Sequence, residues 1–296
     1  MRQIIVGSIK SLLWLLGVIA PAAAVALAFK LFCQPAARAK VRSHERAVMA
    51  QASTETLTVR GQRVVVYRWG GGERPVLLMH GWESRGARFS LLAEQLRAKG
   101  YSPITFDAPG HGESEDNKTT IVDYLAISEA LHQRYGQFEA VVAHSFGVLC
   151  AFYALKQGVG ARCAVAISGV SDFRYLLDTF SSQLGLLAST KAALRERIEG
   201  LFAPLPDIWN RFTVTHDTQG LAQPVLVIHD RQDDTVAFSQ ARLTAEHFGG
   251  RARLIATGGL GHNRILRDAS VLGTVCDFID RARQPESGTN AAAVLT

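Results

Sequence analysis

Short apolar runs alternate with amphipathic stretches over most of the chain from residue 55 to residue 283. The apolar runs are rich in valine, isoleucine and leucine and are uninterrupted, which is typical of strands buried on both faces. The stretches between them carry apolar residues at helical spacing. This alternation predicts an α/β fold, a mostly parallel doubly wound sheet with helices on both faces. The predicted strands of this part are 75–80, 102–107, 140–143, 163–168, 225–229 and 253–256.

A hairpin is predicted ahead of the first parallel strand. Residues 56–60 alternate between polar and apolar, and residues 63–69 contain a continuous apolar stretch. Between them lies Gly61-Gln62, a pair suited to a tight turn. The helical periodicity further along predicts helices over 89–99, 121–135, 148–156, 238–248 and 264–283.

The regular alternation stops between residues 169 and 223. About 55 residues occupy a place where a short crossover would suffice. Apolar residues at helical spacing from Phe173 to Leu187, and a second helical stretch over 191–202, predict a small helical lid above the strand ends. Helices that simply extend the core are compatible with the same pattern, since a lid must bury one face.

The N-terminal segment has a different pattern. Residues 12–29 form an uncharged run bounded by Lys10 and Lys30. A helix of this length would span roughly 27 Å, close to the thickness of a hydrocarbon core. We therefore expect a membrane anchor over residues 1–33, formed by a single transmembrane helix at 12–29 in contact with the lipid bilayer. A signal peptide cleaved near Ala20-Pro21-Ala22 and a buried helix are the alternatives.

The remaining boundaries follow from composition. Residues 34–54 are polar and basic and are predicted to be a linker or an interfacial helix, residues 55–283 a globular domain, and residues 284–296 a disordered tail.

The charge of the chain is unevenly distributed. Of 32 basic and 26 acidic residues, seven basic residues and one acidic residue lie within residues 1–50, which leaves 25 of each sign in the remainder. The formally neutral globular part argues against a nucleic-acid partner. The basic residues that follow the apolar run outnumber the basic groups that precede it, which favours a cytoplasmic catalytic domain. The four cysteines show no paired spacing, which favours the same location.

A candidate nucleophile follows the strand at 140–143. Ser145 lies in the sequence Ala143-His144-Ser145-Phe146-Gly147, between a β-branched apolar run and a helix-forming stretch. Small residues on both sides allow a sharp turn from strand to helix, which would expose the serine hydroxyl at a helix N-terminus.

A base and an acid follow the later strands. His262 lies in a glycine-rich loop after the last strand, and imidazole is well suited to take a hydroxyl proton and to return it. Three acids, at 230, 233 and 234, compete to orient it. We favour Asp233, with Asp234 as its main rival; Asp230 is expected to shape the turn, and Asp172 is a more distant candidate.

Two backbone N–H groups are expected to hold an oxyanion. The N–H of Phe146 follows the serine, and the N–H of Trp82 follows the turn His80-Gly81 at the end of the first parallel strand.

Taken together, these motifs resemble the α/β-hydrolase fold superfamily over roughly residues 55–283. His80-Gly81-Trp82 is similar to the family's oxyanion loop, and Ala143–Gly147 is similar to its nucleophile elbow. Residues 230–236 are similar to the acid loop, whose usual spacing places the acid at Asp233. Gly261-His262 is similar to the base loop. The loop 107–114 is also similar to one of the family, and Asp107 and His111 are expected to be structural there. Ala143 replaces the usual first glycine of the elbow, and Ala237 stands where the family usually has proline.

The resemblance implies a serine hydrolase that cleaves a carboxylic ester or thioester through Ser145, Asp233 and His262, with an acyl-enzyme and without a cofactor. An acyltransferase or cofactor-free perhydrolase on the same residues, and a non-catalytic ligand-binding module on this fold, are the alternatives. The nine histidines lack the spacing of metal ligands. The acyl group, the leaving group and the oligomeric state do not follow from the sequence.

Overall fold

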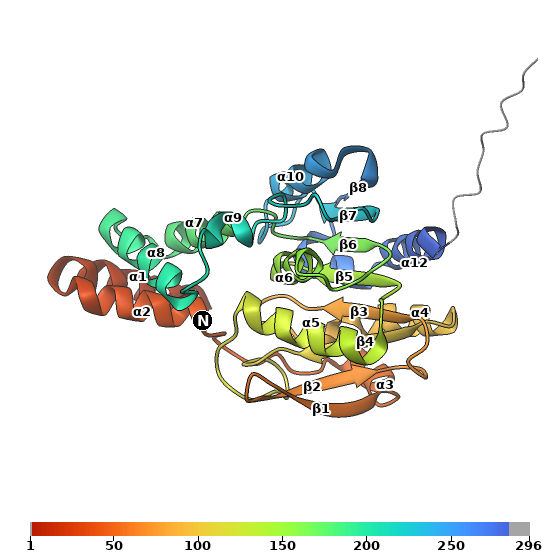
Figure 1. Ribbon diagram of the computed structural model, residues 1–296. Coiled ribbons are helices and arrows are strands. Elements are labelled where there is room, and N and C mark those ends of the chain that lie inside the picture. The colour runs from red at the N-terminus through yellow and green to blue at the C-terminus, as the bar shows by residue number, and fades with distance from the viewer. Residues whose placement is uncertain (1, 284–296) are drawn as a thin grey trace, which may run out of the picture.

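A computed structural model describes residues 2–283, with side chains described from residue 7 onward; the tail predicted over 284–296 lies outside the described residues. Its centre is an eight-stranded sheet in the order β1-β2-β4-β3-β5-β6-β7-β8 (Figure 1). The β1–β2 and β2–β4 pairs are antiparallel, and all other neighbouring pairs are parallel. This confirms the predicted mostly parallel α/β sheet. The strands are β1 (Ser53–Val59), β2 (Gln62–Arg68), β3 (Pro75–Met79), β4 (Ser102–Asp107), β5 (Ala140–His144), β6 (Ala164–Ile167), β7 (Val225–Asp230) and β8 (Ala252–Thr257).

Helices cover both faces of this sheet. One face packs against α5 (Ile121–Tyr135), α6 (Phe146–Lys156) and α10 (Phe238–Phe248), and the other against α4 (Ser90–Ala98) and α12 (Ala269–Arg283). The strands β3 to β7 bury both faces, so their continuous apolar runs separate two cores, whereas the edge strand β8 is only half-buried.

The helix predicted over 264–283 begins later than expected. The chain forms a short helix α11 (Gly261–Arg264) and a 3₁₀ turn (Ile265–Arg267) before α12 starts at Ala269. Asp268 terminates the turn, because its carboxylate accepts a hydrogen bond from the N–H of Val271 at 3.0 Å and so caps the new helix.

The segment between β6 and β7 folds into three helices, α7 (Phe173–Leu184), α8 (Ala188–Leu201) and α9 (Ile208–Arg211). In Figure 1 these helices lie to one side of the sheet, next to the N-terminal helices.

The single helix predicted over 12–29 is wrong. The chain forms α1 (Arg2–Ile19) and α2 (Pro21–Cys33), which lie side by side as a hairpin (Figure 1). Pro21 has no N–H and disfavours a helical conformation at the residue before it, and Ala20 accordingly adopts φ −148° and ψ 68°. Among the described residues, none of the helices combines the length and the apolar character needed to cross a membrane.

The stretch predicted as a linker, 34–54, packs against the globular domain. Glu45 is buried in an ion pair with Arg88, and the carbonyl of Val48 accepts a hydrogen bond from the indole of Trp69 at 2.9 Å. Residues 43–49 form a 3₁₀ turn (Ser43–Glu45) followed by α3 (Arg46–Met49). The N-terminal hairpin is therefore joined to the sheet by an ordered connection.

Candidate active site

Ser145 occupies a strained turn between β5 and α6. Its φ of 58° and ψ of −126° place a non-glycine residue at positive φ, which costs on the order of 1–3 kcal/mol. Two backbone hydrogen bonds maintain this conformation: the Ser145 N–H donates to the carbonyl of Ile167 at 3.0 Å, and the Ser145 carbonyl accepts from the N–H of Val148 at 3.0 Å. The turn also needs Gly147, because a Cβ there would lie 2.5 Å from the carbonyl oxygen of Met79.

The structure brings three of the predicted residues into one hydrogen-bonded chain. Nε2 of His262 lies 3.0 Å from Oγ of Ser145, and Nδ1 of His262 lies 2.8 Å from Oδ2 of Asp233. The three side chains come from the ends of different strands, after β5, β7 and β8, which meet at one edge of the parallel sheet. A proton on Nδ1 directed at Asp233 leaves Nε2 free to accept the serine proton.

The carboxylate of Asp233 is held in its charged form. Burial alone would raise its pKa, but hydrogen bonds from His262 and from the N–H groups of Val236 and Thr235 lower that pKa from 3.8 to about 2. A second imidazole, that of His229, lies 3.4 Å from the same carboxylate and donates to the carbonyl of Val236 at 2.9 Å. Burial lowers the pKa of His229, so this ring remains neutral beside the pair.

The rival acids have other partners. Asp234 is exposed and accepts a hydrogen bond from the hydroxyl of Thr235 at 3.1 Å. Asp172 caps α7 by accepting from the N–H of Arg174 at 3.0 Å. Asp230 shapes the turn, as predicted, and also joins the loops that carry Asp233 and His262, because its carboxylate accepts from the N–H of Leu260 at 2.9 Å.

His144, for which the sequence predicted no role, supports His262. Its Nε2–H donates to the carbonyl of His262 at 2.9 Å, and the two imidazole rings lie 4.7 Å apart. Complete burial, together with the neighbouring His262, lowers the pKa of His144 from 6.5 to about 3. The ring is therefore neutral. In the sequence, the only sign that His144 belongs to the site is its position immediately before Ser145.

The two predicted N–H donors flank the serine. Gly81 lies so close that a Cβ on it would be 2.7 Å from Cβ and 3.2 Å from Oγ of Ser145. The N–H of Trp82, next along the chain, and the N–H of Phe146, first in α6, donate no hydrogen bond within residues 2–283. Both donors are thus free to hold an oxygen that carries negative charge.

The loop that carries Gly81 is fixed by His80. Its Nδ1–H donates to the carbonyl of Gly81 at 2.8 Å, and its Nε2 accepts from the N–H of Ala108 at 3.0 Å. Burial lowers the pKa of His80 well below its usual value, so the ring is neutral and can donate through Nδ1 while it accepts at Nε2.

Asp107 and His111 hold the adjacent loop and do not contact Ser145. The Asp107 carboxylate is fully buried and pairs with Arg85 at 2.9 Å, and Nε2 of His111 accepts from the N–H of Glu83 at 3.2 Å. These contacts agree with the structural part expected of them.

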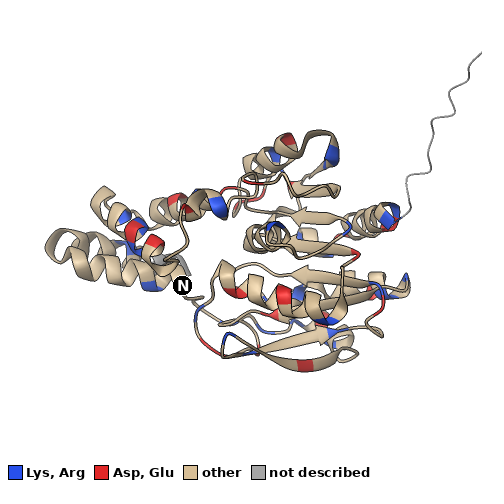
Figure 2. Cartoon of the chain, viewed as in Figure 1, with Lys and Arg blue, Asp and Glu red and all other residues tan. Residues whose placement is uncertain are grey.

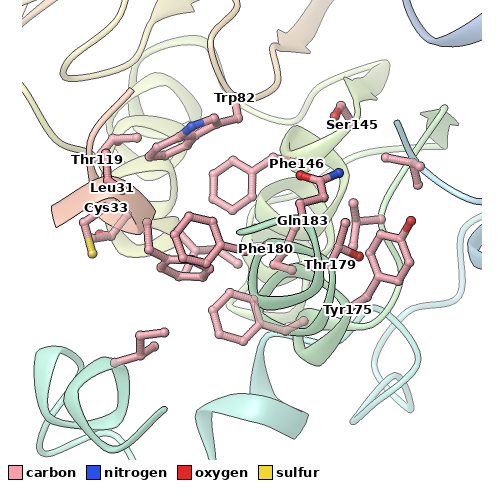
Figure 3. Close-up of a pocket in the computed structure, with 18 of the residues that line it drawn as sticks. Leu31, Cys33, Trp82, Thr119, Ser145, Phe146, Tyr175, Thr179, Phe180 and Gln183 are labelled. Carbon is pink, nitrogen blue, oxygen red and sulfur yellow. The ribbon is translucent and has the colours of Figure 1, made fainter. Parts of the chain in front are cut away.

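Ser145 opens into an apolar cavity of about 270 Å³ (Figure 3). Its walls come from α7 and α8, from the end of α2, and from the loops at Trp82 and Thr235. None of its lining residues carries a charged side chain. The apolar and aromatic lining residues include Leu31, Phe32, Phe146, Val170, Phe173, Leu176, Phe180, Ile198, Leu201 and Phe202.

Several solved structures share this fold. The esterase Pf2001 of Pyrococcus furiosus aligns with a TM-score of 0.63 at 19% identity, over 84% of this chain and 96% of that one. A membrane phospholipase A described as a bacterial virulence factor aligns with a TM-score of 0.61 at 17% identity, over 96% and 100%. The thioesterase domain from the curacin biosynthetic pathway aligns with a TM-score of 0.57 at 15% identity, over 77% and 99%. These likenesses concern the fold.

No curated protein matches the chain at a significant level. The model of the alpha/beta hydrolase family, however, matches residues 76–272, which is more than half of the 296 residues. This range includes β3 except its first residue, β4 to β8, the turn at Ser145 and the loops of Asp233 and His262. The chain therefore belongs to the alpha/beta hydrolase family.

Proposed function

We propose that this protein is a serine hydrolase that cleaves a carboxylic ester or thioester through Ser145, His262 and Asp233. One observation carries the proposal: the hydrogen-bonded chain from Asp233 through His262 ends on a serine hydroxyl at an uncharged, apolar cavity. Membership of a hydrolase family supports the reaction class.

In the first half of the reaction, Oγ of Ser145 attacks the substrate carbonyl carbon while Nε2 of His262 takes the hydroxyl proton. The tetrahedral oxyanion accepts hydrogen bonds from the N–H groups of Trp82 and Phe146. It collapses as His262 returns the proton to the departing alcohol or thiol, which leaves an acyl-serine. Asp233 stabilises the imidazolium and keeps the proton of Nδ1 in place.

In the second half, His262 takes a proton from a water molecule whose oxygen attacks the acyl carbonyl. The same N–H groups hold the second oxyanion. Its collapse breaks the bond to Oγ of Ser145, which regains a proton from His262, and the carboxylic acid product leaves.

The cavity supports an uncharged aliphatic acyl group as the substrate part bound there. Its aromatic and aliphatic walls, with Phe180 and Leu176 among them, would desolvate methylene groups but would leave a charged group without a partner. The volume of about 270 Å³ is close to the roughly 300 Å³ at the lower end of ligand pockets, which suits a chain of moderate length.

Labelling with a fluorophosphonate and turnover of p-nitrophenyl esters test this proposal on the same protein samples. We expect one covalent adduct, found on Ser145 by peptide mass spectrometry, and loss of both adduct and turnover in Ser145→Ala. Ser239→Ala, which changes an exposed serine on α10, is the matched control and should behave as the parent protein. Ester turnover that persists in a folded Ser145→Ala protein would refute the assignment.

A further inference from the structure

The large apolar side chains that face solvent are concentrated on α1. Seven are counted as exposed within residues 7–283, and five of them belong to this one helix. We call these five the outer face of α1: Leu12 (46% exposed), Trp14 (55%), Leu15 (47%), Val18 (57%) and Ile19 (68%).

This face is separate from the side that packs against the protein. Leu13 and Gly17 are buried on the opposite side of the helix, and a Cβ on Gly17 would meet Leu187 at 2.8 Å. The side chains of the outer face occupy a continuous arc of the helix, because positions three and four apart lie on one side. The exposed residues that follow at the start of α2, Pro21, Ala22 and Ala23, add no polar group. A surface of this kind on one side of a helix indicates an interaction site.

The charge near this face has one sign. The helices α1 and α2 contain no acidic residue, and Lys10 and Lys30 on them are exposed. Between residues 7 and 33 these two lysines are the only charged residues of the sequence. In Figure 2 the hairpin is largely tan, whereas the adjoining α8 carries both signs.

We propose that the outer face of α1 docks onto the surface of an anionic lipid bilayer. Its apolar side chains would enter the boundary between headgroups and acyl chains, and the lysines would contact lipid phosphates. A tryptophan such as Trp14 is favoured at that depth. The charge favours lipid over a second copy of this chain, because pairing two such faces would bring the lysines of two hairpins together, and neither α1 nor α2 carries an acid to meet them.

The same hairpin reaches the cavity beside Ser145. Leu31, Phe32 and Cys33 at the end of α2 line the cavity, and Phe32 stacks edge-on against Phe180 with ring centroids 5.3 Å apart. Docking through α1 therefore brings an element of the cavity wall to the lipid surface. The docking itself does not depend on any reaction at Ser145.

Flotation of the full-length protein with vesicles tests the docking. We expect the protein to float with vesicles of phosphatidylcholine and phosphatidylglycerol, and less with phosphatidylcholine alone. Leu15→Ser/Val18→Ser should lower the partition coefficient by at least about tenfold, because two apolar side chains no longer leave water. Leu243→Ser on α10, which is 44% exposed, is the matched control and should leave it unchanged. Circular dichroism melting of each variant verifies folding.

Two further measurements identify the binding partner and separate the docking from the proposed reaction. The tryptophan emission should shift to the blue on vesicle addition, and Trp14→Leu should remove most of that shift, since Trp69 and Trp209 are already buried and Trp82 is half-buried in the cavity wall. Ser145→Ala should float as well as the parent protein, so that a failed catalytic assignment leaves this result intact. Equal flotation of the parent and Leu15→Ser/Val18→Ser would overturn the proposal. The proposal would also be overturned if the parent protein failed to bind vesicles and instead formed a dimer that those substitutions disrupt.

Discussion

Nε2 of His144 lies 2.9 Å from the backbone carbonyl oxygen of His262, so the residue before the candidate nucleophile holds the loop of the candidate base. The contact joins the ends of β5 and β8, which are separated by two strands in the sheet. Because the pKa of His144 is lowered to about 3 by burial and by the neighbouring His262, the donor on Nε2 persists over the whole working pH range. We regard His144 as a positioning residue.

His144→Phe should lower kcat about fivefold and leave KM nearly unchanged. Phenylalanine keeps a ring against that of His262 but loses the N–H donor, and one neutral hydrogen bond is worth about 1 kcal/mol. Steady-state kinetics with a p-nitrophenyl ester measure the split between kcat and KM. A rise in KM alone, with kcat retained, would contradict a positioning role.

Asp233→Asn should lower kcat on the order of 10³- to 10⁴-fold, because an amide neither fixes the Nδ1–H tautomer nor stabilises the imidazolium. Asp234→Asn is a matched control one residue away: Asp234 is exposed and does not contact His262, so its kcat should stay within about twofold of the parent. If Asp234→Asn were the inactive variant, the assignment of the acid would be wrong.

The folded protein should lose a stabilising contribution of Asp233 at low pH. Its pKa falls from 3.8 to about 2 on folding, because hydrogen bonds from His262, Val236 and Thr235 outweigh the opposing effect of burial. The folded state therefore favours the ionised form, and this contribution is complete above pH 3.8 and disappears as the pH falls through 2. The difference in unfolding free energy between the parent and Asp233→Asn should shrink by roughly 1 kcal/mol from pH 5 to pH 3. Urea titrations at both pH values measure it; a constant difference would show that Asp233 is not ionised preferentially.

The parts of the fold that depend on local pattern could be predicted from the sequence. The bounds of β4, α5 and α10 agree with the predicted 102–107, 121–135 and 238–248, because apolar periodicity and adjacent turn residues fix each element locally. The spacing of the acid loop, known from the resemblance to the family, favoured Asp233 over Asp234 without excluding the latter, and it is Asp233 that contacts His262 in the structure.

The parts that depend on contacts between distant residues could not be predicted from the sequence. Nothing in the residues near His144 or His229 indicates that their rings approach His262 and Asp233, because those partners lie in other loops. The uncharged run at 12–29 suggested one long helix, whereas Pro21 ends the first helix and small residues such as Ala24 and Ala28 let the two halves pack together. The apolar character of the run predicted a membrane span, whereas the structure shows two shorter helices. The direction of the chain after Ala20 depends on packing against α7 and α8, which are distant in the sequence.

Gly81→Ala should lower kcat about 100-fold, which is the cost of losing one oxyanion donor. The new Cβ would lie 2.7 Å from Cβ of Ser145 and 3.0 Å from the carbonyl oxygen of His144, so the loop with the N–H of Trp82 must move away. Gly71→Ala is the control, because a Cβ there meets no atom within 4 Å and its φ is not positive. Rates for both variants, with thermal melting to verify folding, separate a displaced donor from general destabilisation. Full activity in Gly81→Ala would exclude the Trp82 N–H as a donor.

Leu176→Trp should change the preferred acyl length. Leu176 on α7 lines the cavity, and a larger ring there would remove part of a volume of only about 270 Å³. The parent protein should hydrolyse p-nitrophenyl octanoate with a higher kcat/KM than the acetate, since each buried methylene contributes about 0.8 kcal/mol. In Leu176→Trp the octanoate should lose at least about tenfold in kcat/KM while the acetate changes little, because a two-carbon acyl group does not reach α7. Leu243→Trp, which enlarges an exposed leucine on α10, should preserve both values. An equal loss for both esters in Leu176→Trp would mean that the acyl chain lies elsewhere, and the cavity beside Ser145 would then accommodate the leaving group instead.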